Sequence, residues 1–282
     1  MSLGLAYKDE SKIYKEVIKK TPYLEYPALK KTGFIKHGFS TRLGGVSEGH
    51  FSSLNLGFLR NDKTELVRSN FEKIGEAMDI LVSNMVFSNQ THTNNVIVVD
   101  ENDKGNGIIT PQKFVDVDGL VTNVPNVCLV TFYADCVPLY FVDSVNKVIG
   151  LSHSGWRGTT LKIAKETVDL MKNRYNTNPK NIMAAIGPSI CQDCYEVSED
   201  VIKDFCQNFC QNLWSELYYK KDKDKYHLNL WKANKLILME AGVSAKNIIV
   251  GNLCTMCNSN LLYSHRAAGE KRGSLAAFLM ID

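Results

Sequence analysis

The sequence predicts a single α+β domain in which helices cover packed β-sheets. Short β-branched apolar runs and amphipathic runs follow one another irregularly along the 282 residues. No internal repeat and no Ser/Gly-rich linker separates them, and 44% apolar residues are enough for one sizeable core. Residues 10–31 are rich in lysine and contain Pro22 and Pro27. We therefore expect residues 1–32 to be a loosely docked arm and residues 33–282 to be the domain.

Three apolar runs in the middle of the chain predict neighbouring strands. Cys136 lies just before the second run, in ADCVPLYF, and His153 lies just after the third, in HSGWRGT. If the strands are adjacent, these two side chains meet at strand ends. The runs are residues 126–133, 139–142 and 148–152.

Further strands border two polar segments. Residues 85–88 and 96–99 predict strands on both sides of the turn NQTHTNN, which contains His92. Asp118 precedes another strand in DVDGLVT. A single histidine in such a turn usually has no special role, so the interest of His92 depends on its neighbours. Two later runs, residues 182–186 and 247–251, also predict strands.

Amphipathic spacing predicts four helices. The first has Val67, Phe71 and Ile74 on one face, begins at Asn61–Asp62 as caps and is expected to cover a sheet. The second opens after Thr160, where free N–H groups suit an anion such as phosphate or simply begin an ordinary helix. The helices are residues 63–80, 161–175, 201–213 and 228–241, and Gly242 ends the last one.

A glycine- and serine-rich segment, residues 36–58, contains apolar anchors and is therefore a candidate for holding a ligand. Within it, Arg42 and Asn55 are the polar side chains that we expect to face a substrate, although a surface arginine and a turn asparagine explain them equally well. His37 and His50 are expected to be structural or exposed. The other candidate substrate contacts are Gln90 and Arg157.

Charge and composition exclude several classes of function. The net charge is only +3, and acids interrupt the clearest basic cluster, residues 220–225, so we expect a solvated loop there and no nucleic-acid partner. No apolar run approaches the roughly 18–20 residues that span a bilayer, and the N-terminus lacks a signal-type apolar region, which predicts a cytoplasmic protein without a membrane partner. Dinucleotide, P-loop, zincin and cytidine-deaminase motifs are absent. The sequence gives no indication of the number of subunits.

The eight cysteines are expected to be mostly reduced thiols. Two pairs have metal-like spacing and together could form a four-cysteine zinc site. Neither pair lies in a knuckle with the usual glycine, and two predicted helices separate the pairs, so their role stays open. Cys206 and Cys210 lie one helical turn apart and are expected to be buried or half-buried. The metal-like pairs are Cys191 with Cys194 and Cys254 with Cys257.

Seven segments in order resemble one known family, the purine nucleoside phosphorylase / laccase-domain family, long called multicopper polyphenol oxidases. The resemblance covers about residues 33–281. It implies central packed sheets with helices outside, in α/β/β/α layers, and a metal site whose ligands are His92, Cys136 and His153. The segments are HGFSTRLGGVSEGHFSSLNLG, NQTHTNNV, DVDGLVT, ADCVPLYF, HSGWRGT, AAIGPSICQDCYEV and LCTMCNSNLLYSHRAAGEKRGSLAAF.

The resemblance also implies an activity. Members of the family are described as phosphorolysing adenosine, inosine and methylthioadenosine to the base and (methylthio)ribose 1-phosphate, and as deaminating adenosine to inosine. We therefore expect a zinc-dependent enzyme whose partners are purine nucleosides and phosphate, with copper as the other metal that suits the ligands.

The residues are compatible with this chemistry. Two histidines and one cysteine leave a tetrahedral zinc one open position, where zinc lowers the pKa of a bound water to about 7. Cys136 is thus both a ligand and a candidate catalytic residue. Either Asp135 or Asp118 is expected to move the proton, unless each only caps a strand end. Arg42, Arg157 and the helix that follows are expected to hold phosphate.

Three other interpretations remain open. A copper-dependent, laccase-like polyphenol oxidase suits the same ligands, but a multicopper cluster needs many histidines in HxH pairs, and this chain has six histidines and no HxH. A cysteine hydrolase would use Cys136 with His153 as base, and would survive a chelator. The third is a binding protein without catalysis.

One motif departs from the family's pattern near the C-terminus. A SYRRD-like sequence is usual there, whereas this chain has Ser264, His265, Arg266, Ala267 and Ala268. Within this stretch we therefore expect a substrate contact from Arg266 alone.

Overall fold

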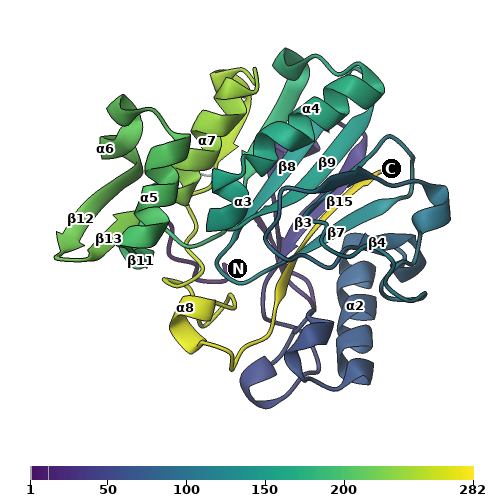
Figure 1. Ribbon diagram of the computed structural model, residues 1–282. Coiled ribbons are helices and arrows are strands. Elements are labelled where there is room, and N and C mark those ends of the chain that lie inside the picture. Colours follow the sequence, from purple (N-terminus) through teal and green to yellow (C-terminus); the bar gives the residue numbers. More distant parts are fainter. Residues whose placement is uncertain (1, 12) are drawn as a thin grey trace.

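The computed structural model describes residues 2–11 and 13–282, which form two six-stranded sheets and a small third sheet (Figure 1). From edge to edge, the first sheet contains β1 (Lys15–Val17), β2 (Tyr23–Glu25), β3 (Ile35–Ser40), β15 (Leu275–Ile281), β7 (Cys128–Tyr133) and β4 (Met85–Phe87). The second contains β14 (Ile248–Val250), β10 (Ile182–Ile186), β8 (Val137–Asp143), β9 (Val148–Ser154), β6 (Gly119–Thr122) and β5 (Val96–Val98). The third contains β11 (Glu196–Ser198), β13 (Lys225–Leu228) and β12 (Tyr218–Asp222).

Helices cover the outer faces of both large sheets. The α-helices of the described residues are α1 (Pro27–Lys30), α2 (Thr64–Met78), α3 (Trp156–Thr160), α4 (Ile163–Tyr175), α5 (Glu199–Asn208), α6 (Trp214–Leu217), α7 (Leu230–Glu240) and α8 (His265–Ala268). α2 packs on the first sheet, whereas α4 and α7 pack on the second (Figure 1). The predicted α+β fold with α/β/β/α layers is confirmed.

Apolar side chains fill the space between each pair of layers. Between the two sheets, Leu129 and Leu279 of the first belong to one fully buried cluster with Leu151 of the second. On the outer faces, Phe71 of α2 and Met171 of α4 are also fully buried. Burying each such side chain contributes about 1.5–3 kcal/mol to stability.

Two predicted helices differ from the observed ones at their N-termini. The helix expected over 63–80 is α2 and covers a sheet as predicted, but its expected cap is wrong. Lys63 is the N-cap residue, because the Asp62 carboxylate turns back to accept hydrogen bonds from the preceding loop. The helix expected over 161–175 begins later, since Lys162 has a φ of +59° and separates α3 from α4.

The region around α5 corrects two further expectations. The helix predicted over 201–213 ends early, so Cys206 is half-buried but Cys210, expected to be at least half-buried, is exposed. Residues 220–225 were expected to form a solvated loop. They belong instead to the β12–β13 hairpin, although their lysines are exposed.

The expectation of a loosely docked arm over residues 10–31 is wrong. β1 and β2 extend the first sheet, and β2 pairs directly with β3. Leu24, Tyr26 and Leu29 are fully buried in the core between the sheets. The described lysines of this range, Lys15, Lys19, Lys20, Lys30 and Lys31, occupy exposed positions around these short buried stretches.

The chain passes between the two sheets where the candidate ligands lie. β7 was expected beside the strands that follow it, but it belongs to the first sheet, and the chain crosses to β8 of the second through Ala134–Cys136. The loop from β4 to β5 makes a second crossing and contains His92. Asp135 and His92 have φ values of +87° and +69°, a conformation that non-glycine residues adopt only where the surrounding structure imposes it.

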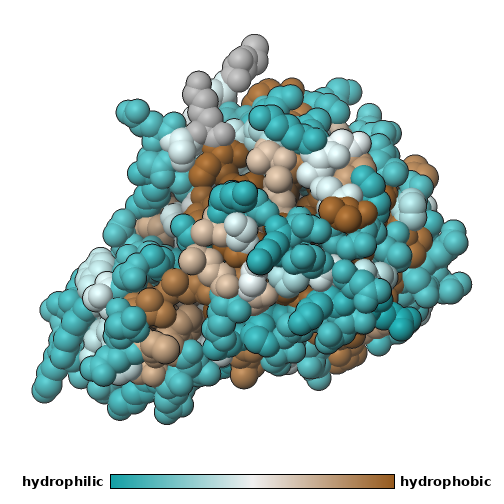
Figure 2. All heavy atoms as spheres, turned by 90° about the horizontal axis from the view of Figure 1, so that it is seen from above, coloured by the Kyte–Doolittle hydropathy of each residue, from teal (hydrophilic) through white to brown (hydrophobic). Residues whose placement is uncertain are grey.

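The outer surface is mainly hydrophilic on the face seen in Figure 2, with apolar side chains in small groups. Isolated apolar residues such as Leu59 and Leu81 are exposed. Among the described residues, no helix combines the length and the apolar character needed to cross a membrane.

Candidate metal centre and adjoining pocket

Three side chains from different parts of the fold converge beside the crossing segments. His92 lies on the β4–β5 crossing, Cys136 on the β7–β8 crossing and His153 near the end of β9. Their potential ligand atoms all lie within 4.8 Å of one another, and Cys136 Sγ is 3.8 Å from His92 Nε2. β8 pairs with β9 so that Pro138 lies opposite His153, which places Cys136 beside it as expected.

Asp118 fixes two of these side chains. It is fully buried, and its Oδ1 lies 2.7 Å from His153 Nδ1. Its oxygens also accept hydrogen bonds from the backbone N–H groups of Thr91, His92 and Thr93 at 2.9–3.1 Å. Although burial opposes it, the hydrogen bond and the charge of His153, helped by these backbone N–H groups, hold the pKa of Asp118 below its usual range. Asp118 therefore positions ligands and has no open path to a substrate.

The donor set fits a metal ion such as zinc. Zn–S and Zn–N distances of about 2.3 and 2.0–2.1 Å in a tetrahedron require S···N separations of about 3.5 Å, close to the 3.8 Å between Cys136 and His92. Since Asp118 engages Nδ1 of His153, Nε2 is left for the ion, an arrangement that metal-binding histidines usually show. Two imidazoles and a thiolate also suit copper.

The thiol of Cys136 is readily ionised. Burial alone would raise its pKa, but the charges and hydrogen bonds of His153 and His92 lower it to about 6. Burial alone would lower the pKa of His153, but the charges and hydrogen bonds of Cys136 and Asp118 raise it to about 9. A thiolate at neutral pH is the form that binds a metal or acts as a nucleophile.

Gly155 allows these groups to pack together, and its sequence context gave no hint of this role. A Cβ atom at Gly155 would lie 2.7 Å from His92 Cδ2 and 3.2 Å from Cys136 Sγ. Any larger residue would therefore push two candidate ligands apart.

Asp135 is largely buried beside Cys136 and holds a neighbouring segment. Its Oδ1 accepts a hydrogen bond from Thr255 Oγ1 at 2.5 Å, and its Oδ2 accepts one from the backbone N–H of Arg266 at 2.6 Å. Both carboxylate oxygens are thus engaged, although a small part of the side chain stays accessible.

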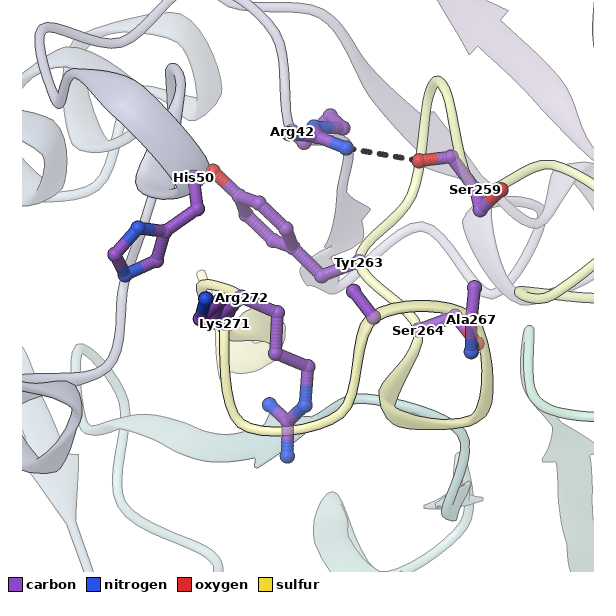
Figure 3. Close-up of a pocket in the computed structure, with 9 residues that line it drawn as sticks. Arg42, His50, Ser259, Tyr263, Ser264, Ala267, Lys271 and Arg272 are labelled. Atoms are coloured by element: carbon purple, nitrogen blue, oxygen red, sulfur yellow. Dashed lines mark hydrogen bonds between the residues drawn. The ribbon is translucent and has the colours of Figure 1, made fainter.

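A pocket of about 220 Å³ lies between the segment of residues 259–272, which contains Arg266, and the loop of residues 42–53 (Figure 3). Arg42 lines it as one of three basic residues. Its guanidinium lies 4.6 Å from the Tyr263 ring centroid and donates to the carbonyls of Ser52 and Ser259. The complete lining is Arg42, His50, Ser259, Tyr263, Ser264, Ala267, Ala268, Lys271 and Arg272.

Arg272 is the main pocket residue that sequence reasoning missed. It is only 6% exposed, and among the described residues it forms no ion pair with a carboxylate. Burial and nearby Arg60 lower its pKa to about 10, against the opposing charges of Asp135, Glu270 and Cys136. Arg272 Nε donates to His265, the chain neighbour of Arg266, whose N–H binds Asp135 beside Cys136. A buried guanidinium without a carboxylate suits an external anion.

Two of the expected substrate contacts are occupied by internal hydrogen bonds. Asn55 is fully buried, and its Oδ1 accepts from the backbone N–H groups of Gly57 and Ser274. Gln90 exchanges two hydrogen bonds with the backbone of Phe132, at 2.7 and 3.0 Å. These contacts hold loops in place, so a direct role in substrate binding is not supported for either side chain.

Two exposed arginines lie on segments that adjoin the metal centre. Arg157 lies 4.3 Å from the Trp156 ring centroid, on α3 directly after β9. Arg266 lies 5.3 Å from the Tyr195 ring centroid and donates to the carbonyl of Cys194. Sequence reasoning also missed Tyr195, the half-buried ring below Arg266, because nothing in its sequence context marks it.

The departure at residues 264–268 has a structural counterpart. His265 is exposed, and its Nδ1 accepts a hydrogen bond of 3.4 Å from Arg272 Nε. Ala267 and Ala268 line the pocket, where longer side chains would narrow it.

Comparison with known proteins gives consistent results. Residues 36–282 match the family model described as multi-copper polyphenol oxidoreductase laccase. The chain is 38% identical over 243 residues to "Purine nucleoside phosphorylase YlmD" of Bacillus subtilis (strain 168), covering 86% of this chain and 87% of that protein. It is 33% identical over 253 residues to "Adenosine deaminase RL5" of an unknown prokaryotic organism, covering 87% and 95%. The crystal structure of the Bacillus licheniformis hypothetical protein YfiH matches with a TM-score of 0.90 and 32% identity, covering 96% of this chain and all of that one.

Proposed function

The chain belongs to the multi-copper polyphenol oxidoreductase laccase family, and from this premise we propose that it is a zinc-dependent purine nucleoside enzyme. Its reactions are phosphorolysis of adenosine, inosine and methylthioadenosine and hydrolytic deamination of adenosine. In the first, the bond between C1′ and the base breaks and a bond from C1′ to phosphate oxygen forms. In the second, water replaces the amino group, and ammonia leaves.

The observation that carries the proposal is the position of a cationic pocket beside three convergent metal-binding side chains. A nucleoside enzyme of this kind needs a place for the base and sugar and a place for phosphate. His92, Cys136 and His153 would hold zinc, and the ion supplies Lewis acidity when bound. The neighbouring basic residues supply the anion site.

Phosphate binding is assigned to the pocket of Figure 3. Arg42 and Arg272 lie on opposite sides of Tyr263, and Lys271 is the third basic residue of the lining. Charge-assisted hydrogen bonds from guanidinium groups match the geometry of phosphate oxygens. Arg157, on α3 four positions after His153, would contact another part of the nucleoside.

The two aspartates take different parts in this proposal. Asp118 positions His153 and the His92 loop, and its burial keeps it from the substrate. Asp135 is the remaining candidate for moving a proton, because it adjoins Cys136 and is slightly accessible. It also ties the pocket segment to the metal centre through Arg266.

Two other functions are distinguished by metal analysis and chelation. A Cys136–His153 hydrolase is favoured by the lowered pKa of the thiol, but a thiol nucleophile needs one imidazole and this thiol faces two. A multicopper oxidase needs a larger histidine set than the two that the described residues gather here.

The test is to incubate the metal-analysed protein with adenosine, with and without phosphate, and to separate the products by chromatography. We expect phosphate-dependent adenine and phosphate-independent inosine, both lost on chelation and restored by zinc. His92→Ala should lose both products, whereas Asn94→Ala on the same loop should keep them. Turnover that survives complete chelation would point to the thiol hydrolase, and absence of nucleoside turnover despite bound zinc would overturn the proposal.

A further inference from the structure

Four cysteines outside the candidate metal centre converge at one point, here called the cysteine cluster: Cys191, Cys194, Cys254 and Cys257. The first two follow β10 and the last two follow β14. β10 and β14 are parallel neighbours, so the loops leave the same edge of the second sheet. Pairing between the backbones of Ser189 and Cys254 continues this arrangement. Cysteines 63 positions apart in the chain therefore meet.

The distances suit a single tetrahedral ion. All four Sγ atoms lie within 4.8 Å of one another, and those of Cys194 and Cys257 are 3.5 Å apart. Zn–S bonds of about 2.3 Å place the sulfurs of a tetrahedral site about 3.8 Å apart. Two disulfides would require two separate pairs at about 2.05 Å, with no reason for all four sulfurs to converge.

Backbone groups also point at the sulfurs. Cys254 is fully buried, and its Sγ accepts hydrogen bonds from the N–H groups of Cys191 at 3.3 Å and Cys257 at 3.5 Å. Two donors directed at one buried sulfur stabilise a thiolate better than a neutral thiol. Such contacts orient and tune the ligands of metal sites.

Positive charge lies where a tetrathiolate site needs it. Zinc with four thiolates carries a net charge of −2, and the ammonium group of Lys8 pairs at 3.1 Å with Asp193, which lies between Cys191 and Cys194 in the chain. The segment with Lys8 is fixed over the cluster, because its N–H donates to the carbonyl of Asn252 at 2.8 Å.

We propose that the cysteine cluster binds one zinc ion as a closed structural site, separate from the ion at His92, Cys136 and His153. The site has no open position for a substrate, since four protein ligands complete a tetrahedron. The ion would join the two loops that follow β10 and β14. Both loops bind Asp135, because the N–H of Ile190 donates to its backbone carbonyl and the hydroxyl of Thr255 donates to its carboxylate.

The test is to measure the molar ratio of zinc to protein in the purified full-length chain by elemental mass spectrometry. We expect two equivalents in the wild type and one in the His92→Ala/Cys136→Ala variant, which leaves the cysteine cluster intact. Cobalt substituted into that variant should show the intense thiolate-to-metal charge-transfer bands of a four-sulfur site. Cys194→Ser/Cys257→Ser should also retain one equivalent, with nitrogen-rich cobalt bands.

A matched control is Cys206→Ser/Cys210→Ser, which removes two cysteines elsewhere and should keep both equivalents. Absence of metal in the His92→Ala/Cys136→Ala variant, whatever the content of the wild type, would overturn the proposal. The mass of the intact, unreduced chain gives a second check. A mass below that of the reduced chain by two hydrogens for each of two disulfides would overturn the proposal as well. The cobalt spectrum does not depend on whether the cysteine variants fold.

Discussion

Asp118 Oδ1 lies 2.7 Å from His153 Nδ1, while the same carboxylate holds the backbone of the loop that contains His92. One buried side chain thus sets the direction of one candidate ligand and the position of another. It also selects the ring nitrogen of His153 that faces Cys136.

Replacing Asp118 with Asn should weaken zinc binding at this centre about 10–100-fold, the usual cost of losing such a support. The amide keeps the shape but loses the charge that strengthens the histidine as a ligand. Competition with a chromogenic chelator measures the affinity. Asp116→Asn is the control, because Asp116 is exposed and the hydrogen bond of its carboxylate to the same loop comes from Thr91 Oγ1. Equal affinities in the two variants would contradict the assigned role.

Replacing Arg42 with Ala should impair phosphorolysis more than deamination. A charge-assisted hydrogen bond to phosphate contributes about 1.5–3 kcal/mol, so kcat/KM for phosphate should fall about ten- to hundred-fold. Steady-state kinetics of the two reactions give the comparison. Arg174→Ala, on the exposed side of α4, should leave both unchanged. Equal losses in both reactions would instead assign Arg42 to support of the loop through Ser52.

Replacing Leu24 with Ala should destabilise the fold by about 2–5 kcal/mol, because a fully buried leucine of β2 leaves a cavity between the sheets. Urea unfolding followed by circular dichroism gives the change in the free energy of unfolding. Lys31→Ala, at an exposed position of the same region, should change it by less than about 0.5 kcal/mol. A loosely docked N-terminal segment would give the same small change for both variants.

The stability of the protein should fall as the pH drops from about 6.5 towards 4. His37 is buried and its Nε2 accepts the N–H of Tyr26, and burial lowers its pKa from 6.5 to about 4. In this range the unfolded chain binds a proton that the folded chain excludes, so the free energy of unfolding decreases by up to about 3 kcal/mol.

Unfolding in urea at pH 7.5 and pH 5 measures this dependence. His37→Gln keeps an acceptor for the Tyr26 N–H but cannot titrate, so its stability should vary less with pH. His50→Gln, at an exposed position, should behave like the wild type. An unchanged pH dependence in His37→Gln would show that other groups cause the loss.

The layered fold could be predicted because its long elements have strong periodicity. α2, α7 and β10 lie close to the predicted ranges, since their apolar faces are continuous. β1 and β2 could not be predicted, because strands of three residues are too short to show an alternation of apolar and polar residues within a lysine-rich segment. The assignment of β7 to a separate sheet depends on the sharp crossing at Asp135, which no local pattern marks.

The candidate ligands were predictable from their residue types, but their surroundings were not. Whether a polar side chain such as Asn55 faces a ligand or its own loop depends on hydrogen bonds to residues more than 200 positions away. The burial of Arg272 is likewise a product of the tertiary fold. The convergence of the cysteine cluster follows from parallel pairing of β10 and β14, which spacing alone does not reveal.

The position of β15 has a consequence for synthesis on the ribosome. This fully buried strand lies between β3 and β7 at the centre of the first sheet, and the bond from Ala276 N to Ser40 Oγ spans 236 positions. Until residues 275–281 emerge, a growing chain has two unpaired strand edges and an open apolar face, features that favour aggregation. Such long-range pairing also slows folding. We therefore expect the nascent chain to be most prone to aggregation before its central strand arrives.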